Sequence, residues 1–190
     1  MRRLGSKYDE EKKRKKNTLI VGIILIFVMF GSVFGVIVGS IGQNNQQDSS
    51  LEYEGYEFVN QNGLWYTIVG NFQFAFTYFP SQVQNNTATL NPLNSYNGKP
   101  LYVHSEDSNS EIEIYRNLQQ IAERVQSACL DENNCEEGLP IKTCSDNFII
   151  IEESSEAEIT QSDNCVYIRG TQEELLELTN EFLFKIIGIK

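Results

Sequence analysis

The chain has 190 residues, enough for one ordinary domain and an appendage, and it carries a net charge of −11. This acidic balance argues against nucleic acid, and against anionic lipid headgroups, as ligands of the bulk of the chain.

An uncharged and almost wholly apolar stretch covers residues 19–41. As a helix it would be roughly 35 Å long, enough to cross the hydrocarbon core of a bilayer. A buried helix of a soluble domain seldom runs this far without a charged residue. The stretch therefore predicts an N-terminal transmembrane helix, with the lipid bilayer as its surroundings.

The flanking charges predict the orientation of this helix. Residues 1–18 contain eight basic and three acidic residues, a net charge of +5, whereas residues 42–190 contain 7 basic and 23 acidic residues, a net charge of −16. Positive flanks stay in the cytoplasm. We expect a basic cytoplasmic tail over 1–18 and an extracytoplasmic remainder. No small-residue cleavage site follows the apolar run, which indicates an uncleaved anchor in the cell membrane.

Gly31, Gly35 and Gly39 recur at four-residue intervals within the predicted span. They share one stripe of the helix and allow another backbone to approach closely. The stripe predicts helix–helix packing, either in a homo-oligomer or with a protein partner.

Residues 42–52 are polar and predict a flexible stalk, so the folded domain is expected over 53–190. Residues 53–79 predict a three-stranded antiparallel meander with turns at Asn62-Gly63 (type I′) and Gly70-Asn71 (type II′). These turns place residue 59 opposite 66 and residue 65 opposite 76. One face then collects mostly aromatic side chains: Tyr56, Phe58, Trp65, Val69, Phe72, Phe74, Phe76 and Tyr78. Such a face predicts core, or a sugar- or peptide-binding platform if it is exposed.

The rest of the domain predicts an α+β fold in the order βββ-β-α-ββ-α, with two helices packed on an antiparallel sheet. A strand is expected over 100–104. A helix capped by Ser108 and Glu111 is expected to run to about Cys129, with Ile114, Leu118, Ile121, Val125 and Ala128 at helical spacing. Strands over 148–152 and 159–168 follow. A capping box of Thr171 and Glu174 then opens a last helix, which buries Leu175, Leu178, Phe182 and Ile186.

The four cysteines (Cys129, Cys135, Cys144 and Cys165) all lie on the predicted outer side. An even number in an oxidising compartment is typical of disulfides, whereas zinc sites usually show paired CxxC motifs that are missing here. A hairpin turn at Ser154-Ser155 would place residue 144 opposite residue 165. The sequence therefore favours the pairings Cys144–Cys165 and Cys129–Cys135.

Polar residues near the middle of the chain are the candidates for chemistry. His104 is expected at a strand end, but no nucleophile can be placed beside it. An acidic cluster follows, made of Glu106, Asp107, Glu111 and Glu113. Residues 107–111 alternate like the start of a calcium loop, yet Ile112 stands where an EF-hand needs glycine. We predict no catalytic residue, no metal site and no cofactor. Asn85-Asn86-Thr87 is an N-glycosylation sequon in a predicted outer loop.

Three segments carry a resemblance: Ala128–Leu130, Leu139–Cys144 and Asp163–Ile168. With the basic start before the span, they resemble a family of uncharacterised single-pass membrane-anchored surface proteins from small-genome archaea. The resemblance implies a cell-surface setting and no mechanism. We expect a non-enzymatic binding or assembly module of the cell envelope. The alternatives are a membrane-tethered hydrolase that uses carboxylates such as Glu106 or Asp107, and an accessory subunit of a membrane complex.

Overall fold

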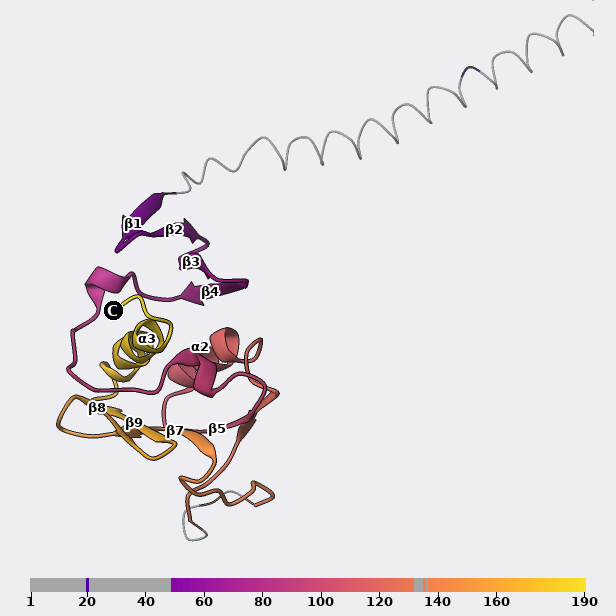
Figure 1. Cartoon of the computed structure of the whole chain (residues 1–190), viewed down its shortest axis with the longest axis vertical. Coiled ribbons are helices and arrows are strands. Elements are labelled where there is room, and N and C mark those ends of the chain that lie inside the picture. Colours follow the sequence, from indigo (N-terminus) through magenta and orange to yellow (C-terminus); the bar gives the residue numbers. More distant parts are fainter. Residues whose placement is uncertain (1–19, 21–48, 132–134, 136) are drawn as a thin grey trace, which may run out of the picture. The chain divides into compact units, whose positions relative to one another are not determined.

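The structure, a computed structural model, describes residues 20, 49–131, 135 and 137–190. All elements below belong to the compact unit from Asp48 to Lys190 (Figure 1). The strands are β1 (Ser50–Tyr53), β2 (Tyr56–Gln61), β3 (Leu64–Val69), β4 (Phe72–Phe76), β5 (Pro100–Ser105), β6 (Arg124–Ser127), β7 (Asn147–Glu153), β8 (Glu158–Ser162) and β9 (Cys165–Gly170). The helices are α2 (Ser108–Leu118) and α3 (Leu175–Ile186), with short 3-10 turns η1 (Pro80–Gln82) and η2 (Leu93–Ser95).

The first sheet is an antiparallel meander in the order β1-β2-β3-β4. Its predicted register is confirmed, since Val59 pairs with Tyr66 and Trp65 with Phe76. The turn after β2 has positive φ at both Asn62 (53°) and Gly63 (82°), as a type I′ turn requires. The predicted aromatic face is also confirmed as core, and its central phenylalanines are completely buried.

β1 adds a fourth strand to the predicted three. It pairs with β2 through a turn at Glu54-Gly55, where both residues again have positive φ (48° and 83°). Because β1 starts at Ser50, regular structure begins inside the predicted stalk (42–52). Glu-Gly is a weaker turn signal than Asn-Gly, so the sequence does not predict this hairpin.

The second sheet is mixed, in the order β6-β5-β7-β9-β8. β5 is parallel to both β6 and β7, and β7 is parallel to β9; only β8 and β9 are antiparallel. The predicted hairpin at Ser154-Ser155 is therefore wrong, and so is the single strand over 159–168, which turns at Asp163-Asn164. The continuous apolar run Phe148–Ile151 is typical of a strand buried on both faces in a parallel sheet.

The first predicted helix is too long. α2 ends at Leu118, and Val125 belongs to β6, which pairs with β5. The short apolar pattern around Val125 fits helical and strand spacing alike. The segment becomes a strand because it pairs with the edge of β5 that β7 leaves open. The N-cap also differs from the prediction, because Asp107 rather than Ser108 accepts the backbone N–H of Ser110, at 2.8 Å.

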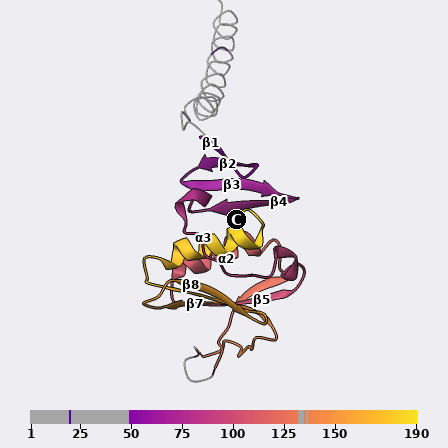
Figure 2. The same ribbon diagram turned by 60° about the vertical axis from the view of Figure 1, so that its left-hand side comes forward.

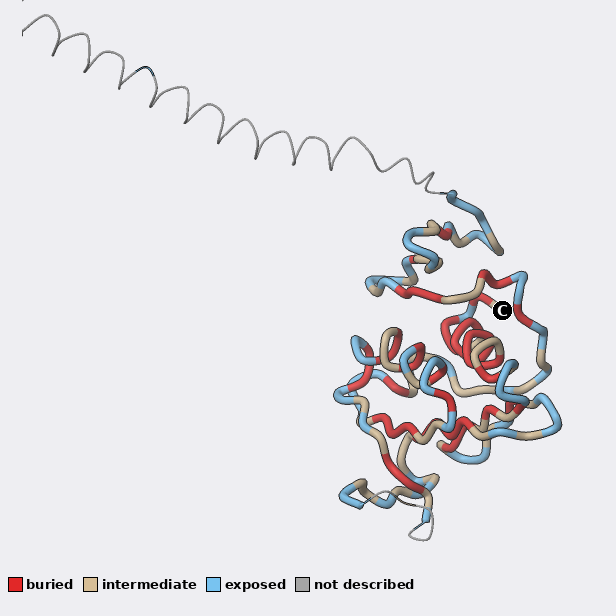
Figure 3. Tube along the Cα trace, turned by 180° about the vertical axis from the view of Figure 1, so that it is seen from behind, coloured by how far each residue is buried: buried red, intermediate tan, exposed pale blue. Residues whose placement is uncertain are grey.

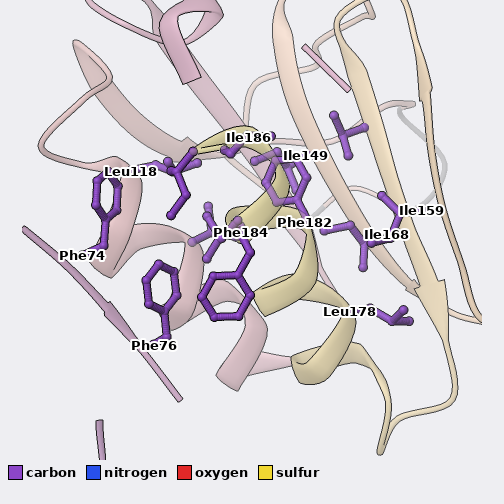
Figure 4. Packing of buried hydrophobic residues seen from close by; sticks show 14 of the residues in the cluster. Phe74, Phe76, Leu118, Ile149, Ile159, Ile168, Leu178, Phe182, Phe184 and Ile186 are labelled. Carbon is purple, nitrogen blue, oxygen red and sulfur yellow. The ribbon is translucent and has the colours of Figure 1, made fainter. Parts of the chain in front are cut away.

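The helices lie between the two sheets, giving three layers that share one core (Figure 2). α3 is buried along nearly its whole length, as expected for a helix covered on both sides (Figure 3). Phe182 and Leu178 point towards the mixed sheet, whereas Phe184 meets Phe76 of the meander, with ring centroids 4.4 Å apart (Figure 4). The predicted buried positions of this helix are confirmed.

Polar side chains of α2 pair with the outer edge of β4. The amide of Asn117 both accepts the N–H and donates to the C=O of Ala75, each at 2.9 Å. Glu113 accepts the N–H of Thr77, also at 2.9 Å. Gln120 extends this row by donating to the carbonyl of Gln73. Side chains of the helix region thus hydrogen-bond the backbone of the edge strand β4, so this edge cannot pair with a strand of another chain.

Gly170 marks a close approach of α3 to β9. A Cβ there would lie 2.7 Å from Leu178 Cδ1 and 3.4 Å from Glu174 Cβ. We expect Gly170→Ala to lower the free energy of unfolding by about 1 to 2 kcal/mol, because Leu178 is buried and has little room to move. Urea denaturation measures this change. Gly98→Ala is the contrast, because a Cβ at Gly98 has open space around it and its cost arises from the positive φ. In a Leu178→Ala background, the cost of Gly170→Ala should therefore fall, whereas the cost of Gly98→Ala should stay the same.

The predicted span (19–41), the cytoplasmic tail (1–18) and the glycine stripe of Gly31, Gly35 and Gly39 fall outside the described residues, apart from Ile20. In the portion of the chain that is described, no helix is both long and apolar enough to span a bilayer. The transmembrane helix and its orientation remain predictions.

Candidate functional site

The strongest candidate site lies at the carboxyl ends of β5 and β7. These strands are adjacent and parallel, but the chain leaves them in opposite directions: from β5 through α2 to β6, and from β7 through β8 to β9. In open α/β sheets, ligands bind where neighbouring connections diverge in this way. A cavity of about 450 Å³ opens here, lined by His104, Glu106, Cys129, Leu130, Asp131 and Glu152.

A smaller cavity of about 220 Å³ adjoins the first and shares His104 and Cys129 with it. It extends towards the end of β6, with Ser127 and the helix residue Glu111 in its wall. The hydroxyl of Ser127 donates to Glu111 Oε1 at 3.1 Å. Together the two cavities bring His104 and two members of the predicted acidic cluster, Glu106 and Glu111, to one edge of the mixed sheet.

The carboxylates of the larger cavity are engaged by the fold itself. Glu106 Oε2 accepts the backbone N–H of Glu153 at 2.7 Å. Glu152 Oε2 accepts from Arg169 Nε at 3.2 Å, and the same guanidinium reaches Glu158 at 3.1 Å. Arg169 partly neutralises the charge of Glu152, and the backbone N–H of Glu153 holds the carboxylate of Glu106 against the end of β7. The site is therefore a shaped, polar hollow rather than a set of free carboxylates.

The remaining members of the acidic cluster point elsewhere. Asp107 is buried as the N-cap of α2 and also accepts the Ser110 hydroxyl at 2.6 Å. Glu113 faces the opposite side, between α2 and β4. Within the described ranges, no three His, Cys, Asp or Glu side chains are grouped so as to hold a metal ion. Within the calcium-like pattern over 107–111, Asp107 caps α2 and Glu111 accepts the Ser127 hydroxyl.

Two carboxyl groups with raised pKa lie in the interior, away from the cavity at the strand ends. Burial raises the pKa of Glu113, against the opposing effects of the Thr77 N–H and of Arg116. Burial likewise raises the pKa of Glu181 on α3, whose Oε1 accepts the N–H of Asn86 and whose Oε2 has no partner among the described residues. Strongly shifted groups in a cleft would point to catalysis. These two instead tie loops and strands to helices.

Glu181 makes a prediction about pH. Because its pKa is raised in the folded state, the folded protein takes up this proton more readily than the unfolded chain, and stability improves as the pH falls through that pKa. Glu181→Gln keeps an acceptor for Asn86 without the charge. We expect its melting temperature to exceed that of the wild type at pH 7, and the gap to close as the pH is lowered towards 5. A gap that widens on acidification would contradict this assignment.

Both predicted disulfides are present, Cys129–Cys135 and Cys144–Cys165, and no described cysteine is free. The predicted hairpin is not what aligns the second pair. Parallel pairing of β7 with β9 places Phe148 beside Cys165, and the N–H of Asn164 donates to the carbonyl of Cys144 at 3.2 Å. The Cys144–Cys165 bridge fastens the end of the segment over 129–144 to the start of β9, whereas Cys129–Cys135 closes a short loop at its beginning.

This disulfide-bonded segment helps cover the outer face of the mixed sheet. Tyr102, Phe148, Ile150 and Cys165 form a small buried cluster there with Ala128. Lys142 lies 4.3 Å from the centre of the Tyr102 ring, and Arg124 donates to the Tyr102 hydroxyl at 2.9 Å. Hydrogen bonding to Lys142 and Arg124 lowers the pKa of Tyr102. Backbone hydrogen bonds of Cys129 with Pro140 (3.0 Å) and Lys142 (2.8 Å) hold the Cys129 wall of the cavity in place.

A cavity lies at the end of the meander formed by the β1–β2 hairpin. Tyr53 and Tyr56, paired across the β1–β2 hairpin, are half-buried and line a separate cavity of about 430 Å³. Its other walls come from Glu54, Asn85 and the C-terminal residues Gly188–Lys190. The sequon residue Asn85 is exposed at the rim. The sequence named Asn85 and the aromatic face separately, and the fold brings them together.

Comparisons with protein families, with curated proteins and with solved structures give no match to this chain. Fold class and site geometry are therefore the grounds on which a function is proposed. They define a three-layer α+β domain with two disulfides and a polar hollow at the carboxyl ends of parallel strands.

Proposed function

We propose that the chain is a single-pass membrane-anchored module of the cell envelope whose extracytoplasmic domain binds another protein or envelope component without catalysing a reaction. The observation that carries this proposal is the engagement of Glu106 with the Glu153 N–H and of Glu152 with Arg169. A general acid or base must exchange protons with a substrate, and an ion-paired or backbone-bound carboxylate is poorly suited to that task. The same contacts preorganise a rigid binding surface.

Two further features support the extracytoplasmic location. Disulfides persist in oxidising compartments, and the described domain holds two of them. The charge asymmetry across residues 19–41 gives the same orientation, with the N-terminus in the cytoplasm.

A membrane-tethered hydrolase is the second candidate. The cavity at the divergence of β5 and β7, with His104 in its wall, favours it. Hydrolysis of ester, glycoside or phosphate substrates that disappears in His104→Ala and Glu106→Gln would establish this candidate and remove the binding module. We expect none above background.

The glycine stripe supplies a route to assembly within the membrane. We expect Gly35→Leu to weaken association roughly tenfold or more, because a leucine separates helix backbones that glycine lets approach. Gly22→Leu is the matched control, since at ~100° per residue it lies on the opposite side of the helix from Gly31. Mild-detergent purification of the full-length protein from native membranes after brief crosslinking, followed by identification of co-purifying proteins, makes the measurement.

The outcomes of this purification distinguish the modes of assembly. A partner lost in Gly35→Leu and kept in Gly22→Leu identifies a complex subunit assembled through its span. A partner retained in both variants assigns binding to the outer domain. Recovery of the protein alone, in every preparation, would contradict the proposed function.

A further inference from the structure

The sequon Asn85-Asn86-Thr87 occupies an exposed segment between the 3-10 turns η1 and η2, where the chain forms no helix or strand. Asn85 and Thr87 are both exposed. An acceptor asparagine must be reached from solvent on a backbone that a transferase can engage, so exposed irregular segments are where such modification occurs. The fold therefore presents this motif accessibly.

The segment is anchored on both sides of Asn85, while Asn85 itself is left out of the hydrogen bonding. The N–H of Gln84 donates to Glu177 at 2.9 Å, and the N–H of Asn86 donates to the buried carboxyl of Glu181. The Asn85 amide has no hydrogen bond to any described residue. Other asparagines of the domain, such as Asn117 and Asn180, use their amides to hold the fold together.

The cavity beside Asn85 suits a sugar. The partly exposed Tyr53 and Tyr56 line it, and Glu54 and Lys190 add charged residues to the same lining. Aromatic faces with a few polar groups around them are a common lining for small-ligand sites, and tyrosine combines an apolar ring with a hydrogen-bonding tip. The C–H face of a pyranose attached at Asn85 would pack on these rings.

We propose that Asn85 is N-glycosylated and that the first sugars of the glycan lie against Tyr53 and Tyr56. The donor is a lipid-phosphate-linked or lipid-pyrophosphate-linked oligosaccharide. Asn85 Nδ2 forms a bond to the anomeric carbon, the bond from that carbon to the phosphate oxygen breaks, and the phosphate leaves with the electron pair. The amide loses one proton to a base of the transferase. The inference rests on the proposed extracytoplasmic location.

Modification at Asn85 also restricts where a partner can bind. A glycan over the β1–β2 hairpin shields that end of the meander. The cavity that contains His104 and Glu106, built on the other sheet, stays open to a partner. Glycosylation and binding are thus assigned to separate surfaces.

The test is mass spectrometry of the peptide containing Asn85, from full-length protein purified from its native membranes. We expect a mass increase of whole sugar residues, lost in Asn85→Gln and in Thr87→Ala and retained in Thr87→Ser, which keeps the sequon. In the glycosylated protein, hydrogen exchange over residues 53–56 should be slower than in Asn85→Gln. Unchanged exchange would overturn the packing on Tyr53 and Tyr56.

Counting thiols in the same samples separates the two proposals. An unmodified Asn85 in protein whose cysteines are oxidised overturns glycosylation and leaves the extracytoplasmic location intact. An unmodified Asn85 in protein with four free thiols overturns both. A glycan at Asn85 supports both together.

Discussion

Asn117→Leu is expected to lower the free energy of unfolding by about 2 to 6 kcal/mol, because each buried backbone group left without a partner costs about 1 to 3 kcal/mol. Both the N–H and the C=O of Ala75 lose their partner in this variant, and Ala75 is buried between the meander and α2. Leucine has the same number and branching of side-chain heavy atoms as asparagine, so the substitution leaves no cavity, and the loss reports the missing hydrogen bonds together with the cost of fitting two larger methyl groups. Chemical denaturation followed by circular dichroism measures it.

The geometry explains why one helix can satisfy this strand edge. Four residues of helix advance ~6 Å and two residues of strand advance ~6.6 Å. Glu113 and Asn117 on α2 therefore stay in step with Thr77 and Ala75. Asn117 occupies the place that a neighbouring strand would take.

Gln120→Leu is the matched control. Gln120, in the turn just after α2, also donates its amide to a backbone carbonyl of the same strand, that of Gln73, but at the exposed end of the row. Water replaces that bond, so we expect a loss of at most about 0.5 kcal/mol. Equal losses in the two variants would contradict the proposed role of Asn117 in holding the layers together.

The second large effect is expected from the Cys144–Cys165 disulfide. Replacing both cysteines with alanine should lower the free energy of unfolding by about 3 kcal/mol, because the bridge closes a long loop of the unfolded chain. The two cysteines are 21 residues apart. The bridge also joins the segment before β7 to the start of β9, so the variant should expose the cluster around Tyr102.

The Cys129–Cys135 bridge provides the comparison. Its cysteines are only 6 residues apart. Chain entropy assigns such a bridge about 2 kcal/mol, roughly 1 kcal/mol less than the longer loop. Urea denaturation of both double alanine variants without reductant tests the order. A greater loss from the shorter loop would contradict this account of the disulfide-bonded segment.

The meander could be predicted from the sequence because its information is local. Asn62-Gly63 and Gly70-Asn71 fix two turns, and each turn sets a strand register. Both registers place the aromatic side chains on the same face of the sheet. The last helix was predicted for the same reason, since its apolar positions recur at helical spacing. Only the β1–β2 hairpin, with its Glu54-Gly55 turn, lacked a strong signal.

The mixed sheet could not be derived in this way. Parallel partners are joined by long connections, so no turn residue records that β5 lies beside β7. The disulfide Cys144–Cys165 was predicted correctly from an incorrect hairpin, because residues 144 and 165 are also brought together by the parallel register. The cavity at the strand ends depends on that register. His104 and Glu106 were named from sequence, whereas Glu152 and Asp131 could not be placed beside them.

The disulfide-bonded domain is proposed to lie on the extracytoplasmic side of the membrane and to bind a partner there. Treating intact cells with a membrane-impermeant amine crosslinker, and mapping the crosslinked lysines, tests it most directly. The account predicts reaction at domain lysines such as Lys99 and Lys142, with links to a second protein, and no reaction at the tail lysines Lys7 and Lys12. Reaction at the tail with an unreactive domain would contradict it.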